Sequence, residues 1–295
     1  MKIIITGSLG NISLPLVTRL IEQQHEVTVI TSNAERQQQI EVIGAKPTVG
    51  NLHDTAFLTA VFTGADAVYC MVPPDFNQPD QEGYYRRIGN SYTESIRRSG
   101  IGRVVNLSSW GAHLPAGTGF ITGSYIVEQL FNGIHGIELT HIRPTSFYYN
   151  FLHFIPMIKA IGMIATVYGG NDKLAMVAPS DIASAIADEL VSMGDHPEVR
   201  YVSSDDRSCN EIAQVLGSAI GKPDMKWIAI TPAQALEALL KNGFSKEAAG
   251  KMVELNNAIH TGLLREDYDL HMPVPGNFKL EQFAEDFAKA YNGVR

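Results

Sequence analysis

Short apolar runs alternate with amphipathic stretches through the first half of the chain. The apolar runs, rich in β-branched residues, predict strands at 2–6, 26–31, 46–49, 67–72, 103–107 and 137–142. Between them, apolar residues recur at helical spacing and predict helices at 11–23, 34–43, 54–62, 81–99 and 122–132. Strands that alternate with helices indicate a parallel sheet with right-handed crossovers. The uninterrupted apolar strands fit burial on both faces of that sheet.

The pattern changes after Pro144. Aromatic residues cluster over 147–154, and helical patterns then dominate at 179–191, 210–220, 232–240, 246–259 and 280–291, with short strand candidates at 201–203 and 227–230. We therefore predict an α/β protein with a doubly wound (Rossmann) parallel sheet and a smaller, mostly helical substrate lobe. The predicted Rossmann domain covers residues 1–150, with a returning segment near 176–203, and the lobe is formed by 151–175 and 204–295.

Composition and charge narrow the function classes. The net charge of −8 argues against a nucleic-acid-binding surface, which needs a basic patch. The sequence shows no signal peptide and no apolar run long enough to span a membrane, so we expect a cytoplasmic protein. Cys70 and Cys209 are far apart, and we expect both to be reduced thiols. The absence of CxxC and of histidine pairs at metal-ligand spacing predicts no metal site.

A glycine turn, ITGSLGNIS, joins the first predicted strand to the first helix. In a doubly wound sheet this turn approaches the pyrophosphate of a dinucleotide, and the helix N-terminus offers N–H groups and a positive dipole end to the phosphates. Gly7 and Gly10 hold the first two glycine positions, and the small side chain of Ser13 occupies the third. The position of the turn, after the first strand of an alternating α/β pattern, predicts a dinucleotide site.

The end of the second strand bears on the choice of coenzyme. A carboxylate at this point binds the ribose 2′-OH of NAD, whereas a nearby basic residue suits the 2′-phosphate of NADP. The strand ends TSNAER, with Thr31 and Ser32 at its end and Arg36 shortly after. Because hydroxyls and a guanidinium stand where a carboxylate would favour NAD, the sequence favours NADP(H) over NAD(H).

Five segments together resemble the NmrA-like group of atypical short-chain dehydrogenases: ITGSLGNI at 5–12, GNLHD at 50–54, VVNLSS at 104–109, HIRPTSFYYN at 141–150 and VAPSDIASA at 177–185. The resemblance implies a Rossmann fold that binds NAD(P)H. It also implies cofactor contacts from the ends of the strands. These are Gly7, Leu9, Gly10, Asn11 and Ile12 at the pyrophosphate, Asn51 and Leu52 near the adenine, Met71, Val72 and Pro73 beside the nicotinamide ribose, and Ser108, Thr145 and Phe147 at the nicotinamide and substrate cleft.

The chain departs from this family at the positions used for proton transfer. Short-chain dehydrogenases usually carry a serine and then Tyr-x-x-x-Lys on the following helix. Ser108 or Ser109 fills the serine position. Aligning Glu128 with the family's helix glutamate places Phe120 and Ser124 where tyrosine and lysine stand, and neither side chain titrates usefully. The usual Tyr-Lys pair is therefore missing.

Three other residues are candidates for proton transfer: Ser109, His113 and Tyr125. His113 follows the serine strand in a loop and has the side chain of a general acid, although a loop histidine is more often simply solvated. Tyr125 is the nearest tyrosine to the expected position, but it lies about 100° around the helix from Ser124, and Gln129 stands where its lysine would be.

An apolar substrate pocket is predicted from aromatic and neighbouring residues, namely Pro74, Tyr84, Trp110, His113, Phe147, Tyr148 and Tyr149. The same aromatic stripe also fits packing between sheet and lobe, and the sequence leaves both interpretations open.

Two functional hypotheses follow. In the first, the chain is an NAD(P)H-dependent reductase that passes hydride to a quinone or similar conjugated acceptor, because such an acceptor needs no strong acid from the protein. In the second, it is a non-catalytic NAD(P)-binding redox sensor, like the NmrA-type regulators it resembles, and acts through a protein partner. A sugar epimerase is less favoured, since that chemistry relies on the missing tyrosine.

Overall fold

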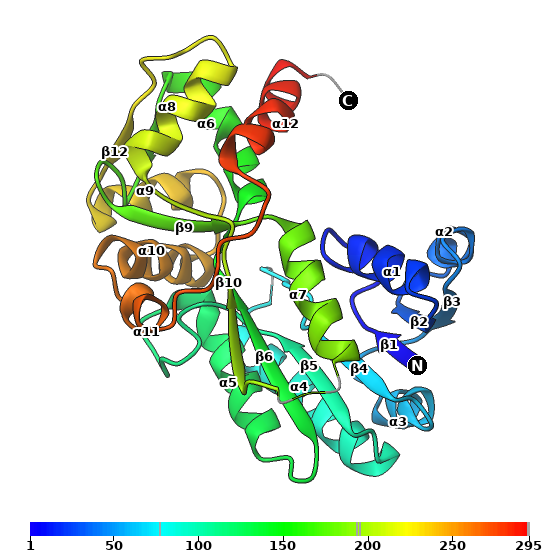
Figure 1. Cartoon of the computed structure of the whole chain (residues 1–295). Coiled ribbons are helices and arrows are strands. Elements are labelled where there is room, and N and C mark those ends of the chain that lie inside the picture. The colour runs from blue at the N-terminus through cyan, green and yellow to red at the C-terminus, as the bar shows by residue number, and fades with distance from the viewer. Residues whose placement is uncertain (77, 193, 195, 294–295) are drawn as a thin grey trace. The chain divides into compact units, whose positions relative to one another are not determined.

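The computed structural model describes residues 1–76, 78–192, 194 and 196–293, and it divides into two compact units (Figure 1). Unit 1 comprises Met1–Pro115, Thr122–Arg143 and Ile182–Arg200. Unit 2 comprises Ala116–Ile121, Pro144–Asp181 and Tyr201–Arg295. No helix in the described part of the chain is both long and apolar enough to cross a membrane.

A seven-stranded sheet forms the centre of unit 1, in the order β10-β6-β5-β4-β1-β2-β3. Its strands are β1 (Lys2–Ile5), β2 (Glu26–Thr31), β3 (Lys46–Val49), β4 (Ala67–Cys70), β5 (Arg103–Leu107), β6 (Glu138–Pro144) and β10 (Val199–Val202). The pairs from β3 through β6 are parallel, and β1 lies between β2 and β4. The predicted doubly wound α/β fold is confirmed. The strand order reverses beside β1, so ligands are expected beyond the carboxyl ends of β1 and β4.

Helices cover both faces of this sheet. They are α1 (Ser13–Glu22), the short 3-10 helix η1 (Ala34–Arg36), α2 (Gln37–Val42), α3 (Thr55–Phe62), α4 (Gln81–Ser99), α5 (Thr122–Asn132) and α7 (Pro179–Val191), whose first turn belongs to unit 2. Figure 1 shows α3, α4 and α5 along one face. Aliphatic and aromatic side chains form a core that includes residues of α3, α4 and α5. On the other face, Arg19 of α1 forms an ion pair with Asp188 of α7 at 3.3 Å.

Two glycines let α4 and α5 pack closely. A Cβ atom on Gly123 of α5 would lie 2.5 Å from the ring of Tyr85, and one on Gly89 of α4 would lie 2.8 Å from a methyl of Leu130. Burial under α5 raises the pKa of Tyr85 to about 12. The helical layer therefore has a tight, glycine-dependent seam.

Unit 2 contains short strands as well as helices. A three-stranded sheet has the order β11 (Asp205–Ser208), β9 (Lys173–Val177), β7 (Ser146–Phe147), and β12 (Trp227–Ala229) pairs with β8 (Ile164–Thr166). The helices are η2 (Gly119–Ile121), η3 (Tyr148–Phe154), α6 (Ile155–Ile161), α8 (Cys209–Ala219), α9 (Pro232–Lys241), α10 (Lys246–His260), α11 (Arg265–Leu270) and α12 (Leu280–Asn292). The sequence pattern missed β7, β8, β9 and β11, although it predicted the equally short β12.

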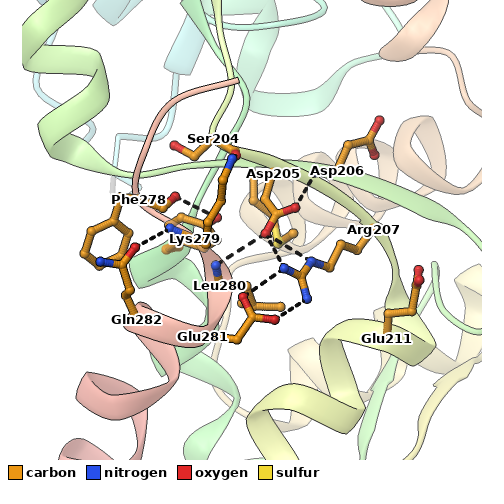
Figure 2. Close-up of polar contacts among 12 residues, drawn as sticks. Ser204, Asp205, Asp206, Arg207, Glu211, Phe278, Lys279, Leu280, Glu281 and Gln282 are labelled. Carbon is orange, nitrogen blue, oxygen red and sulfur yellow. Dashed lines mark hydrogen bonds and ion pairs between the residues drawn. The ribbon is translucent and has the colours of Figure 1, made fainter. Parts of the chain in front are cut away.

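Charged side chains fasten the start of α12 to β11 (Figure 2). Arg207 donates to both carboxylate oxygens of Glu281, at 2.6 and 2.9 Å, and also pairs with Asp205 at 2.8 Å. Lys279 donates through Nζ to the carbonyl of Ser204 at 2.6 Å. Bidentate arginine–carboxylate geometry fixes orientation as well as distance, so this network sets where α12 begins.

Candidate cofactor-binding site

The turn between β1 and α1 requires glycine at its first position. Gly7 has φ +88°, in the left-handed region, and a Cβ atom there would lie 2.9 Å from both Cγ and Sδ of Met71. The next residue, Ser8, also has positive φ, at +56°. Glycine is thus required at position 7 both for the positive φ and for the space next to Met71. Without a side chain there, the backbone of the turn stays open to a ligand.

Ser13 replaces a third glycine without opening a gap. Its side chain is 3% exposed, and its Oγ donates to the carbonyl of Thr6 at 3.4 Å. The hydroxyl therefore links the start of α1 to the end of β1. No side chain caps α1 at Ile12, and Gly10 and Asn11 beside it are exposed. Leu14 already donates its N–H to the carbonyl of Gly10 at 2.9 Å and Pro15 has no N–H, so the backbone donors left for phosphate oxygens lie before Leu14.

A polar cluster lies beyond the end of β2. Ser8 donates through Oγ to Thr31 Oγ1 at 3.0 Å, and the exposed Arg36 donates through Nη1 to Ser8 Oγ at 3.1 Å. The side chain of Asn33 caps η1, which carries Arg36, by accepting from the N–H of Glu35 at 2.9 Å. The structure thus brings the predicted residues Thr31 and Arg36 together. It adds Ser8, which the sequence analysis missed. Ser32 is exposed at the same strand end.

The residues after β3 form a small turn in front of α3. The side chain of Asn51 accepts from the N–H of His53 at 3.0 Å and is exposed, while Leu52 packs against the core under α3 and α4. A Cβ atom on Gly50 would lie 2.3 Å from the ring of Phe57. The turn is therefore held against α3, with Asn51 open to solvent.

Two tyrosines of α4 hold the backbone after β4. Tyr92 donates to the carbonyl of Met71 at 2.8 Å, and Tyr84 donates to the carbonyl of Pro73 at 3.0 Å. Burial raises the pKa of both phenols, so they remain neutral donors. Thr6 Oγ1 accepts from the N–H of Met71 at 3.0 Å. Tyr84, predicted for the substrate pocket, thus has its hydroxyl directed to the backbone.

Ser108 belongs to a buried charged network. Its Oγ donates to Glu128 of α5 at 2.5 Å, and Arg143 at the end of β6 donates to both oxygens of the same carboxylate at 2.9 and 2.7 Å. The side chains of Arg143 and Glu128 are only 8% and 3% exposed. The predicted serine position is therefore tied to an ion pair.

A second polar chain lies beside this network. His141 of β6 contacts Asn106 through Nδ1 at 3.0 Å and Asn132 through Nε2 at 2.9 Å. Burial lowers the pKa of His141 to about 4, so the ring is neutral near pH 7. A neutral ring that accepts from the Asn106 amide at Nδ1 carries its proton on Nε2. Both ring nitrogens of His141 are thus used in hydrogen bonds within the protein.

The remaining candidates for proton transfer lie in two segments of unit 1. Ser109 and His113 are partly exposed in the turn after β5, and Tyr125 is partly exposed in α5 of unit 1. Of the two positions that replace the family's tyrosine and lysine, Phe120 lies in η2 of unit 2 and Ser124 in α5 of unit 1.

The aromatic residues after β6 divide into core and surface. Tyr148 stacks on Phe283 of α12, with ring centroids 5.5 Å apart, and is 1% exposed. Phe147 and Tyr149 form a partly exposed ring pair with centroids 5.1 Å apart. Thr145, also in unit 2, is buried and donates its N–H to the carbonyl of Val202 at 3.1 Å.

The other residues predicted for the pocket belong to unit 1. Trp110 is buried there, and Pro74 is exposed. The substrate pocket predicted from residues of both units stays a prediction.

Comparison with known proteins shows the family of the chain. A family model described as NAD(P)H-binding matches residues 7–192, more than half of the sequence. The chain belongs to this family. Its assignment to the NmrA-like atypical short-chain dehydrogenases, predicted from the sequence segments, is confirmed. The glycine turn, the uncapped start of α1 and the Ser8–Thr31–Arg36 cluster fit NAD(P)H, and NAD(P)H binding follows from family membership.

Several relatives have named activities. The chain is 25% identical over 293 residues to an NAD(P)H azoreductase of Xenophilus azovorans, covering 98% of this chain and 97% of the relative. It is 25% identical over 222 residues to a (4-alkanoyl-5-oxo-2,5-dihydrofuran-3-yl)methyl phosphate reductase of Streptomyces griseus, covering 75% of this chain and 74% of that one. Both relatives are named as reductases.

Solved structures share the fold. An NADPH-dependent quinone oxidoreductase of Escherichia coli, in complex with NADPH, matches with a TM-score of 0.80 and 19% identity over 96% of this chain and 99% of its own. A triphenylmethane reductase of Citrobacter sp., in complex with NADP(H), matches with a TM-score of 0.80 and 17% identity over 97% and 99%. At these identities the likeness concerns the fold.

Proposed function

We propose that the chain is an NADPH-dependent reductase that passes hydride to a quinone or a similarly conjugated acceptor. The observation that carries the proposal is the arrangement at the ends of β1 and β2, where the glycine turn, the uncapped start of α1 and the Arg36–Ser8–Thr31 cluster adjoin one another. The turn and the helix would bind the pyrophosphate, and the cluster would bind the ribose phosphate.

The cluster supports NADPH over NADH. The 2′-phosphate of the adenosine ribose lies beyond the end of the second strand in this fold. Arg36 is exposed there and 3.1 Å from Ser8 Oγ, so its guanidinium already lies at the turn. A guanidinium donates to phosphate in charge-assisted pairs, whereas the 2′-OH of NADH offers it no negative charge.

The residues at the proton-transfer positions support a conjugated acceptor. When bound, the coenzyme supplies hydride. Phe120 and Ser124 carry no proton that titrates near neutral pH. The hydroxyl of Ser108 is engaged in a hydrogen bond to the carboxylate of Glu128. The chain would therefore bind and orient its substrates, while water protonates an acceptor that delocalises the added charge.

The names of similar proteins point in the same direction. Quinones, azo compounds, triphenylmethane dyes and a dihydrofuranone are acted on or named in those relatives. Each has a π-system that accepts hydride directly. This shared chemistry, more than any one of the relatives, supports a conjugated acceptor for this chain.

Binding titrations test the coenzyme assignment. Arg36→Ala should weaken NADPH binding by roughly tenfold to a hundredfold, which corresponds to the loss of one charge-assisted hydrogen bond. NADH binding should change little. Arg98→Ala is the matched control, because Arg98 is exposed on α4 and forms a local i,i+4 pair with Glu94. Equal losses for NADPH and NADH in Arg36→Ala would contradict the phosphate role.

An acceptor panel tests the reaction. NADPH oxidation should be observed with quinones and other conjugated acceptors. Tight NADPH binding without turnover on any acceptor would refute the reductase and favour the redox-sensor hypothesis.

A further inference from the structure

The residues of unit 1 that carry sulfur differ sharply in solvent exposure. Its described residues include three that carry sulfur, Met1, Cys70 and Met71. Cys70 is a free thiol with no exposed surface, and burial raises its pKa well above the usual range, which suppresses the reactive thiolate. Met1 is 39% exposed and precedes β1, at the amino edge of the sheet. Met71 is partly exposed and follows β4, at the carboxyl edge.

The thioether of Met71 forms one wall of the glycine turn. A Cβ atom on Gly7 would lie 2.9 Å from Met71 Cγ and Sδ and 3.3 Å from Ser13 Oγ. The sulfur is therefore in van der Waals contact with the turn that would carry the pyrophosphate. Leucine would fill a similar volume. Methionine differs from it in being oxidisable at sulfur.

The backbone of Met71 is fixed on both sides. Its N–H donates to Thr6 Oγ1 at 3.0 Å, and its carbonyl accepts from Tyr92 at 2.8 Å. Both partners belong to well-packed elements, because Thr6 and Tyr92 have no exposed surface. A change in the side chain must consequently be absorbed at the turn, since these hydrogen bonds keep the backbone from moving away.

We propose that Met71 is an oxidation site through which peroxide weakens NADPH binding. This inference rests on the coenzyme site of the proposed function. In the reaction the sulfur attacks one peroxide oxygen and the O–O bond breaks. The thioether becomes a sulfoxide, losing two electrons, and the peroxide is reduced to water.

The expected loss of affinity follows from size and charge. The new oxygen adds bulk to a side chain already in contact with Gly7, and it carries partial negative charge. A pyrophosphate on the same turn is an anion, so the two repel each other. Reduced quinones can return electrons to oxygen and form peroxide, so a reductase of this class would generate the oxidant near this site.

Oxidation followed by titration tests the proposal. The full chain is treated with hydrogen peroxide, Met71 sulfoxide is quantified by peptide mass spectrometry, and the Kd for NADPH is measured before and after treatment. The wild type should lose about fivefold or more in affinity, the lower range of typical coupling energies. Met71→Leu should keep its own starting Kd after the same treatment. Treatment of oxidised wild type with methionine sulfoxide reductases should restore binding.

Met272→Leu is the matched control, because Met272 is 58% exposed in unit 2 and should be oxidised in the wild type without consequence for NADPH. This variant should lose affinity on oxidation as the wild type does. Equal losses in wild type and Met71→Leu would overturn the proposal, as would unchanged affinity once Met71 sulfoxide has formed, or oxidation of Met272 with Met71 left intact. A reduced wild type that binds NADPH but turns over no acceptor would refute the reductase alone, since the oxidation test measures binding.

Discussion

Replacing Glu128 by glutamine should strongly destabilise unit 1. The carboxylate is 3% exposed and accepts from Ser108 at 2.5 Å and from Arg143 at 2.9 and 2.7 Å, and Arg143 itself is 8% exposed. Glutamine keeps the shape but removes the negative charge that faces the buried guanidinium of Arg143. Breaking a buried pair in this way costs about 3–5 kcal/mol, whereas the intact pair contributes much less net stability.

Urea unfolding followed by circular dichroism measures this effect. Glu94→Gln is the matched control, because it removes the same charge from an ion pair with Arg98 on α4 whose side chains are 43% and 60% exposed. That exposed i,i+4 pair should contribute only about 0.3–0.5 kcal/mol. Similar midpoints for the two variants would refute the reasoning, since burial of the Glu128–Arg143 pair would then have no energetic consequence.

Three further predictions concern packing, pH and thiols. Gly50→Ala should lose about 1–3 kcal/mol in unfolding free energy, because its Cβ would overlap an aromatic ring at 2.3 Å, while Gly102→Ala, with open space around it, should lose nothing. The pKa of His141 is lowered to about 4 in the folded chain from an ordinary 6.5, so the unfolded chain binds the extra proton. The free energy of unfolding should therefore fall by up to roughly 3 kcal/mol as the pH is lowered from 6.5 to 4. In His141→Gln, the free energy of unfolding should change less with pH over this range. Cys70 and Cys209 should resist iodoacetamide in the folded protein and react in denaturant, since burial raises both pKa values; alkylation of the native protein at the denatured rate would contradict this.

The elements that the sequence predicted best are those with local stop and start signals. The helix at 81–99 was predicted at its observed bounds, because Asp80 caps its start and Gly100, with φ +71°, ends it. The strand at 26–31 and the helix at 179–191 also match. By contrast, the sequence did not predict β8 and β9, whose partners β12 and β11 lie dozens of residues further along the chain.

The same distinction holds for the site. Thr31 and Arg36 were predicted because the end of a strand has a defined place in this fold. Ser8 was missed, since its contact with them depends on a turn with φ +56° that folds back toward β2. The commitment of Ser108 to Glu128 was equally hidden, because it joins residues 20 positions apart on a strand end and a helix.

The steady-state rate of NADPH oxidation, followed at 340 nm in parallel with a quinone and with a saturated ketone, measures whether the chain reduces conjugated acceptors without a protein acid. Turnover is expected with the quinone and none with the ketone, because Phe120 and Ser124 offer the ketone oxygen no titrating acid. Turnover of the saturated ketone at a comparable rate, or no turnover of the quinone, would contradict this expectation.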